Sequence, residues 1–400
     1  MWHSTENVLP VIGREKCLFD TDIQSHAAEL KELVSTSSFL VIGGAGTIGQ
    51  AVVKEIFRRA PKRLHVVDIS ENNLVELVRD IRSSLGYIEG DFRTLPLDCG
   101  SKQFRAMFRV EAPYDYVLNL SALKHVRSEK DPYTLMRMIE VNVLNTESTL
   151  RLASEFGAKK YFGVSTDKAV RPSNAMGASK RVMELCLMRA SREIPVSTAR
   201  FANVAFSDGS LLHGFIQRIH KRQPLAAPQD VQRYFITAEE SGQLCLMSCL
   251  LGENRDLFYP KLVEQFQLTR FDTICKKFLE QLGLEPVACE TEEEARSLVE
   301  ELAAKKQWPC YFFDSDTTGE KDYEEFYSDD DVLNLDRFQG FGVVRGPELA
   351  EEKSLATFFE NVQGLLDRDQ WTRNDLLEIL QTTVADFAHK ETNKFLDNRM

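Results

Sequence analysis

The sequence predicts an α/β protein built around a doubly wound parallel sheet. Two observations predict this class. Short apolar runs alternate with helical patterns from residue 39 onward, and a glycine-rich turn joins the first of these runs to a helix. The length of 400 residues is sufficient for one large core with an appendage, or for two domains.

The predicted elements alternate along the chain. Runs rich in apolar, β-branched and aromatic residues predict strands at 39–42, 64–67, 94–97, 116–120, 161–164 and 196–200. Apolar residues at helical spacing predict helices at 48–59, 72–83, 133–156 and 178–191. Because a helix that crosses over between two strands returns the second strand parallel to the first, this pattern predicts βαβ units.

The chain is expected to have three parts. Residues 1–38 form an extension with one helix at about 21–34, and residues 39–262 hold the sheet with interleaved parts of a smaller, substrate-binding subdomain. Beyond them we expect a C-terminal α-rich elaboration over 263–400, with helices at 271–282, 291–305 and 374–395. An aromatic and acidic stretch at 308–327 lies among these helices, and it can either cover a site or form a subunit contact.

The composition excludes some classes of protein. The formal net charge of −12 argues against a nucleic-acid binder, because neutralising phosphates requires clustered lysine and arginine. The eight cysteines form no CxxC pair, so we expect reduced thiols, no metal site and a cytoplasmic protein. No stretch approaches the roughly 18 apolar residues of a membrane helix, and the N-terminus lacks the pattern of a signal peptide. We therefore expect a soluble protein without membrane insertion.

A glycine-rich turn joins the first predicted strand to the following helix. Gly43, Gly46 and Gly49 are spaced three residues apart, and Thr47 and Ile48 lie between the last two. Small residues let the backbone turn tightly and approach a pyrophosphate at the positive N-terminus of a helix. Because a strand precedes the motif and a helix follows it, the sequence predicts a Rossmann-type dinucleotide site here.

Two carboxylates close the next two predicted strands. Asp68 lies about 20 residues beyond Gly49, where a carboxylate accepts hydrogen bonds from the adenosine ribose hydroxyls. A carboxylate there also repels a 2′-phosphate, so we expect NAD and regard NADP as the less favoured cofactor. Asp98 can hold the adenine amino group, or it can serve as an ordinary turn residue.

Three further segments carry polar residues after predicted strands. The first is NLSALKHV at 119–126, and the second is GVSTDKAV at 163–170 with RPSNAMGASK at 171–180. The third is RFANV at 200–204, followed by SDGS at 207–210. Because open α/β sheets hold ligands at the carboxyl ends of their strands, we expect these segments to meet at one site.

These segments resemble the extended short-chain dehydrogenases/reductases. Within them they are most similar to the UDP-N-acetylglucosamine 4,6-dehydratases of capsule, flagellin and glycoprotein sugar synthesis. The similar runs are ALKHV, STDKA, MGASK and RFANV, and the lead-in at 12–15 and 22–23 resembles that of larger membrane-anchored members. The resemblance covers about residues 11–250 and implies an NAD(P)-dependent hydro-lyase. It also implies a nucleotide-sugar substrate, most often UDP-N-acetylglucosamine, and a homo-oligomer.

The dehydratase reaction requires an acid and a base side by side. Hydride leaves C4 of the hexose, the resulting ketone acidifies the C5 proton, and water then leaves across C5 and C6. Asp167 and Lys168 follow the fifth predicted strand, at the sheet edge that holds ligands. By the resemblance, Asp167 protonates the departing hydroxyl and Lys168 takes the C5 proton. A surface ion pair at a strand end is the structural alternative.

The tyrosine of the superfamily is replaced in this chain. A tyrosine usually stands four residues before the lysine that matches Lys180, and it acts as the base for hydride transfer while the lysine binds the nicotinamide ribose. Met176 occupies this position and cannot carry a proton. The C4 hydroxyl must then lose its proton to Lys180, to Asp167 or to a water held by Thr166. A methionine here also resembles the branch of dehydratases that retains the configuration at C5.

Four further residues are expected to bind the substrate. Lys124 and His125 follow the fourth predicted strand, where a cation can hold the sugar or its phosphate. The resemblance places Asn203 at the diphosphate or sugar and Arg233 near the nucleotide phosphates. A bidentate guanidinium suits a pyrophosphate, although a structural arginine is the alternative. Asn142, on the long predicted helix, is expected to support the loop geometry.

Three functions remain open on the sequence. A 4,6-dehydratase accounts for Asp167 and Lys168, whereas a 4-epimerase or 4-reductase shares the fold and cofactor without needing that pair. A non-catalytic dinucleotide-binding protein would account for Met176. The nucleotide is expected to be UDP, with GDP as the alternative.

Overall fold

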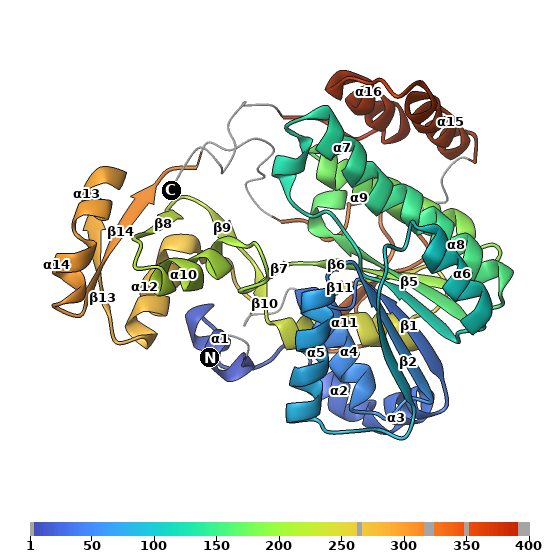
Figure 1. The fold of residues 1–400 in the computed structure, drawn as a ribbon, viewed down its shortest axis with the longest axis horizontal. Helices are drawn as coiled ribbons and strands as arrows, with labels where there is room; N and C mark the ends of the chain where they lie inside the picture. Colours follow the sequence, from blue (N-terminus) through green and yellow to red (C-terminus); the bar gives the residue numbers. More distant parts are fainter. Residues whose placement is uncertain (1–3, 262–265, 316–323, 348–351, 391–400) are drawn as a thin grey trace.

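The computed structural model describes residues 4–261, 266–315, 324–347 and 352–390, and a nine-stranded sheet forms its centre (Figure 1). In chain order its strands are β1 (Ser38–Ile42), β2 (Arg63–Asp68), β3 (Asp91–Pro96), β4 (Tyr116–Asn119), β5 (Lys160–Thr166), β6 (Val196–Phe201), β11 (Asp256–Pro260), β15 (Leu333–Asn334) and β16 (Phe341–Val344). Across the sheet they run in the order β15, β16, β11, β6, β5, β4, β1, β2, β3.

The seven strands from β11 to β3 are mutually parallel; at the other edge, β16 runs antiparallel to β11, and β15 runs antiparallel to β16. The chain moves outward from β1 through β2 to β3, then returns to β4 on the other side of β1. This reversal makes the sheet doubly wound, as the sequence predicts. The six predicted strands are all present, and the third begins three residues earlier than expected.

Helices cover both faces of this sheet (Figure 1). One group packs into a single apolar core with alternate strand residues: α3 (Ala27–Ser35), α4 (Thr47–Phe57), α5 (Glu71–Ser84) and α11 (Ala238–Leu251). The second group packs into another core on the opposite face: α6 (Lys102–Glu111), α7 (Pro132–Ile139), α8 (Asn145–Glu155), α9 (Ala175–Ala190), α15 (Glu352–Arg368) and α16 (Arg373–Thr383). Phe39 and Val41 belong to the first core, whereas Leu40 and Ile42 belong to the second, because side chains alternate along a strand.

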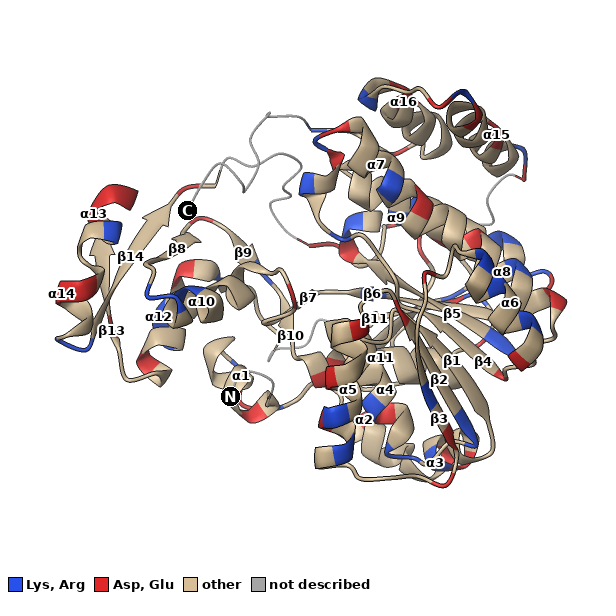
Figure 2. Cartoon of the chain, viewed as in Figure 1, with Lys and Arg blue, Asp and Glu red and all other residues tan. Residues whose placement is uncertain are grey.

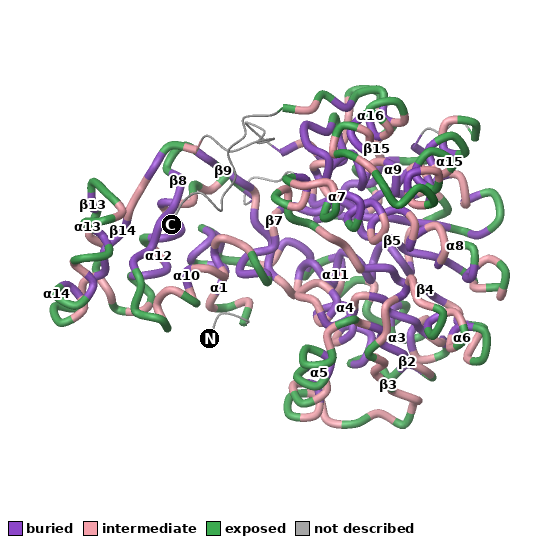
Figure 3. Tube along the Cα trace, turned by 45° about the horizontal axis from the view of Figure 1, so that its top comes forward, coloured by how far each residue is buried: buried purple, intermediate pink, exposed green. Residues whose placement is uncertain are grey.

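A smaller subdomain lies beside the sheet (Figure 1). Its three parallel strands are β13 (Glu285–Cys289), β14 (Gln307–Phe313) and β8 (Leu225–Pro228), in that spatial order. The accompanying helices are α1 (Thr5–Val11), α10 (Leu211–His220), α12 (Phe271–Gln281), α13 (Glu292–Ser297) and α14 (Val299–Ala303). Two short ladders join it to the large sheet: β7 (Asn203–Val204) with β10 (Phe235–Ile236), and β9 (Gln232–Arg233) with β12 (Thr269–Arg270). Figure 3 shows buried residues in both parts.

The region after residue 262 is rich in helices, and it also supplies strands that the sequence pattern did not predict. Its strand β14 lies beside β8, and its strand β16 pairs with β11, so it completes both sheets. Local sequence patterns missed these strands because each is stabilised by a partner distant in sequence.

Several helices differ from their expected bounds. The helix expected at 21–34 is interrupted at His26, which separates α2 (Asp20–Ser25) from α3. The helix expected at 133–156 contains a π-turn at Glu140–Leu144 between α7 and α8. The helix expected at 374–395 is α16, which ends at Thr383; residues 384–390 are not helical, and residues 391–395 lie outside the described residues. The helix α15 was not expected.

The acidic helices of the small subdomain carry their charges on the solvent side. Figure 2 shows acidic residues on α13 and α14, while Ala295, Val299 and Leu302 point inward and are buried. Arg296 pairs with Glu292 and Glu293 within α13. Among the described residues, no helix combines the length and hydropathy needed to cross a bilayer.

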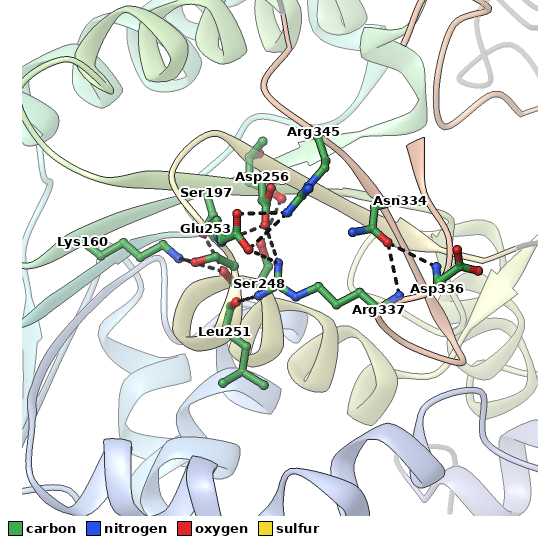
Figure 4. Close-up of polar contacts among 12 residues, drawn as sticks. Lys160, Ser197, Ser248, Leu251, Glu253, Asp256, Asn334, Asp336, Arg337 and Arg345 are labelled. Carbon is green, nitrogen blue, oxygen red and sulfur yellow. Dashed lines mark hydrogen bonds and ion pairs between the residues drawn. The ribbon is translucent and has the colours of Figure 1, made fainter. Parts of the chain in front are cut away.

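Two cations cap the C-terminus of α11 (Figure 4). The Lys160 ammonium donates to the carbonyl oxygens of Ser248, at 3.3 Å, and Gly252. The Arg337 guanidinium donates to the Leu251 carbonyl. The last carbonyls of a helix have no partner within the helix and carry partial negative charge, so cations stabilise them. Together these hydrogen bonds join β5 and the segment before β16 to the C-terminal end of α11.

Replacing Lys160 by methionine is expected to lower the free energy of unfolding by about 1–3 kcal/mol, because buried carbonyls lose charge-assisted hydrogen bonds. Urea denaturation of the purified variant measures this change. Lys159 is the matched control: its side chain is 65% exposed and pairs with Asp115. Lys159→Met should cost less than about 1 kcal/mol. Equal effects from the two substitutions would contradict a role for Lys160 in capping α11.

Candidate functional site

A cavity of about 560 Å³ lies between the large sheet and the small subdomain. On the sheet side it is lined by residues at the carboxyl ends of β1, β4, β5 and β6. On the other side it is lined by Leu212 of α10, Arg233 of β9, Phe235 of β10 and Phe271 of α12. Open α/β folds hold ligands at this edge of the sheet, so this cavity is the candidate active site.

The glycine-rich turn forms one end of the cavity. Gly43 has φ of +75°, which favours glycine, and a Cβ at Gly49 would lie 2.2 Å from the Gly43 carbonyl oxygen. A Cβ at Gly46 would meet only that same oxygen, at 3.8 Å, so the backbone there is open to a ligand. Among the described side chains, none caps the N-terminus of α4 at Gly46. The turn therefore leaves helix N–H groups for an anion, as a dinucleotide pyrophosphate requires.

Thr47 and Ile48, the first two residues of α4, also line the cavity. The Thr47 hydroxyl oxygen accepts a hydrogen bond of 3.0 Å from the Asp208 backbone N–H. This hydrogen bond holds the segment SDGS, at 207–210, against the first turn of α4. The third polar segment thus lies against the glycine-rich turn.

Asp68 and Asp98 lie outside the residues that line this cavity. The Asp68 carboxylate accepts hydrogen bonds of 2.9 Å from the backbone N–H groups of Ala45 and Ser70, so it orients the glycine-rich turn. Each carboxylate oxygen has a further lone pair for a ribose hydroxyl. Asp98 accepts from the Gly100 N–H and pairs with Arg137 at 3.1 Å, which is the arrangement of a turn residue.

Asp167 and Lys168 form an ion pair inside the cavity. The Lys168 Nζ lies 3.2 Å from both carboxylate oxygens of Asp167. The Asp167 side chain is 4% exposed and that of Lys168 is 30% exposed. The Thr166 hydroxyl donates to Asp167 at 2.8 Å and accepts from the Lys168 backbone N–H. Asp167 and Lys168 line the same cavity as the glycine-rich turn. The pair is therefore not an exposed ion pair at a strand end.

Met176 and Lys180 lie one turn apart on α9, and both line the cavity. The Lys180 Nζ donates to the Val164 carbonyl at 3.1 Å. Burial lowers the pKa of Lys180 to about 8, and Glu184 opposes that shift. A lysine with such a pKa exchanges a proton readily near neutral pH.

Lys124 and His125 form another wall of the cavity. Burial lowers the pKa of both side chains, and Asp208 partly opposes the shift for Lys124. The Lys124 Nζ lies 3.4 Å from the Ser207 hydroxyl. The Asn142 side-chain amide accepts a hydrogen bond from the Leu123 N–H at 3.0 Å and donates one to the Leu123 carbonyl at 3.1 Å. It therefore supports this loop as expected.

Asn203 and Arg233 also line the cavity, but Asn203 has an unexpected partner. Its side-chain amide donates to the carboxylate of Glu324, and the Tyr234 backbone N–H donates to the other oxygen of Glu324 at 2.6 Å. The Arg233 guanidinium donates to the Gln232 carbonyl at 2.7 Å. Sequence reasoning thus named both residues as site residues, but it did not reveal the Glu324 carboxylate that binds Asn203.

Glu324 is the site residue that sequence reasoning missed. It is 6% exposed, lines the cavity, and follows Asn203 by 121 residues. Its only sequence signal was its place within the aromatic and acidic stretch at 308–327, for which covering a site was one expectation. Residues 316–323 of that stretch lie outside the described residues.

Comparisons with known proteins agree on a family and a fold. A family model described as polysaccharide biosynthesis protein matches residues 39–345. An uncharacterised membrane protein of Methanocaldococcus jannaschii is 28% identical over 79% of this chain and 88% of its own length. A UDP-glucose 4-epimerase of Rickettsia prowazekii is 28% identical over 88% of this chain and 97% of its own.

The solved structure of Pen from Bacillus thuringiensis has the same fold. It superposes with a TM-score of 0.64 at 21% identity, over 82% of this chain and 98% of that chain. The doubly wound α/β architecture with a smaller subdomain is thereby confirmed.

Proposed function

Because the chain belongs to the polysaccharide biosynthesis protein family, we propose that it is a nucleotide-sugar 4,6-dehydratase. The proposed substrate is UDP-N-acetylglucosamine or a close nucleotide-linked amino sugar, and the product is the 4-keto-6-deoxy sugar with retention at C5. One observation carries the proposal: Asp167 and Lys168, 3.2 Å apart, line the same cavity as the glycine-rich turn.

The glycine-rich turn fits a nicotinamide dinucleotide, and we propose NAD. Gly43, Gly46 and the N-terminus of α4 would hold its pyrophosphate, Asp68 its ribose hydroxyls, and Lys180 the nicotinamide ribose. When bound, this cofactor supplies an acceptor for hydride from C4 and returns the hydride to C6.

The residues of the chain supply the proton transfers. Asp167 protonates the C6 hydroxyl as it leaves, and Lys168, as the neutral amine, takes the C5 proton and later returns it. Lys124, His125, Asn203 and Arg233 would bind the sugar and diphosphate. The C4 hydroxyl loses its proton to Lys180, to Asp167 or to a water held by Thr166, whose hydroxyl donates to Asp167.

A 4-epimerase is the second candidate, favoured by the UDP-glucose 4-epimerase among the relatives. The purified protein is incubated with UDP-N-acetylglucosamine and NAD, and the products are analysed by mass spectrometry and chromatography. A dehydratase yields a product lighter by one water molecule. A new product of unchanged mass would support the epimerase, and no product from any UDP- or GDP-linked hexose in a panel would contradict both functions.

A further inference from the structure

A closed set of hydrogen bonds fixes Asn203 in the cavity wall. Its backbone N–H donates to the Tyr234 carbonyl at 3.0 Å, where strand β7 begins beside β10. Its side-chain Nδ2 donates to one carboxylate oxygen of Glu324 and, at 3.4 Å, to the same Tyr234 carbonyl. The Tyr234 N–H closes the set by donating to the other Glu324 oxygen at 2.6 Å. Asn203 is therefore held both at its backbone and at its amide nitrogen.

The segment that carries Glu324 is itself anchored. Glu324 is 6% exposed, and both of its carboxylate oxygens accept hydrogen bonds. Glu325, the next residue, pairs with Arg171 at 3.2 Å. The Phe326 carbonyl accepts a hydrogen bond of 2.8 Å from the buried Arg200 side chain. Contacts on three consecutive residues therefore hold the Glu324 carboxylate in place.

These partners decide which end of the Asn203 amide is left for a ligand. A backbone carbonyl accepts hydrogen bonds at every pH, and a carboxylate only accepts them once it is ionised. The amide nitrogen must therefore face Tyr234 and Glu324, and both of its hydrogens are committed there. Among the described residues none donates to the amide oxygen, Oδ1, and this oxygen is not one of the fully buried polar atoms without a partner. It is open to a ligand in the cavity that Asn203 lines.

The chemistry of the proposed substrate decides which part of it can meet this oxygen. The oxygens of an ionised diphosphate have no hydrogen to donate, and the lone pairs of Oδ1 would repel them. A hexose hydroxyl, or the N–H of an acetamido group, does donate. We infer that Glu324 is a positioning residue that fixes Asn203 as a hydrogen-bond acceptor for a hydroxyl or amide N–H of the hexose. Of the two partners expected for Asn203, the diphosphate and the sugar, this selects the sugar. The inference rests on the proposed nucleotide-sugar function.

Glu324→Gln is expected to turn the Asn203 amide over. The Tyr234 N–H is a fixed donor and takes the glutamine oxygen, so the glutamine NH₂ group points at Asn203 and attracts its oxygen in place of its nitrogen. The longer contact of Asn203 to the Tyr234 carbonyl is the weaker of its two and does not prevent this. The cavity then presents a donor where the hexose needs an acceptor.

Binding of UDP-N-acetylglucosamine and of UDP, which lacks the sugar, measures this change by calorimetry with NAD present. In Glu324→Gln we expect the Kd for UDP-N-acetylglucosamine to rise about tenfold, whereas the Kd for UDP stays within about twofold. Every variant carries Lys168→Ala as well, to block turnover during the titration. The titrations are run at pH 9, because burial raises the pKa of Glu324 to about 8 and the carboxylate must be ionised.

Two further variants show whether Glu324 acts through Asn203. Asn203→Ala removes the acceptor and should weaken binding of UDP-N-acetylglucosamine by the same tenfold, again without affecting UDP. Combined with Glu324→Gln it should cause no further loss, because two changes to one interaction are not additive. Glu325→Gln is the matched control on the same segment: Glu325 pairs with Arg171, does not line the cavity and should leave both Kd values unchanged.

The outcomes separate the inference from the proposed function. A protein that binds a nucleotide sugar but releases no water from it contradicts the dehydratase, and the comparison of that sugar with its nucleoside diphosphate still decides the role of Glu324. Tighter binding of UDP by Glu324→Gln would place Asn203 at the diphosphate and overturn the inference alone. Unchanged Kd values, equal losses for both ligands, or additive losses in the double variant also overturn it. Failure to bind any UDP- or GDP-linked hexose overturns both.

Discussion

Lys168→Ala is expected to lower kcat for water loss by about 1,000-fold or more, while the dinucleotide remains bound. The reason is that the proposed base for C5 is removed, and general bases contribute on the order of 10²–10⁴ in rate. The glycine-rich turn is untouched by the substitution, so cofactor binding should persist. The rate is measured by mass spectrometry of the product, and the bound dinucleotide by extraction from the purified protein.

A second substitution separates a base from a structural ion pair. Lys168→Arg keeps a positive charge beside Asp167, but an arginine stays protonated and cannot take a proton. If Lys168 acts as a base, the arginine variant stays as inactive as the alanine variant. Recovery of turnover by arginine would show that only the charge matters. Lys305→Ala, which removes a lysine 57% exposed on the small subdomain, is the control and should retain full activity.

Arg200→Met is expected to lower the free energy of unfolding by about 3–5 kcal/mol, because it leaves the buried Glu184 carboxylate without its main partner. Arg200 contacts Glu184 through two nitrogens, at 2.9 and 2.8 Å, and both side chains are almost fully buried. Chemical denaturation measures the change. The exposed pair of Arg222 and Glu300 is the control, and Arg222→Met should cost less than about 1 kcal/mol.

The same pair predicts how stability depends on pH. Arg200, together with Arg181 and Ser165, holds the pKa of Glu184 at about 2, below the ordinary 4.5, although burial opposes this. A folded-state pKa below the unfolded value stabilises the protein above pH 4.5, and this stabilisation is lost as pH falls toward 2. Arg200→Met should therefore show a shallower loss of stability over that interval. An unchanged acid dependence would contradict the assignment.

Six of the seven parallel strands could be predicted because their signals are local, whereas β11 was not expected. Along β1, for example, apolar residues alternate between two cores, as Phe39 and Leu40 do. The glycine-rich turn is equally local, since Gly43 needs a positive φ and Gly49 approaches the Gly43 carbonyl within a few residues. The neighbours Asp167 and Lys168 were predictable as a pair because adjacency in sequence brings them to the same strand end.

The tertiary structure alone decided the roles of residues after 262. The pairings of β14 with β8 and of β16 with β11 join segments distant in sequence, and no local pattern specifies such partners. The partner of Asn203 was likewise hidden, because Glu324 reaches it only after those strands are in place. The physical reason is that strand pairing and burial of a charged group depend on the whole fold, whereas turns, alternation and neighbouring residues depend on the chain alone.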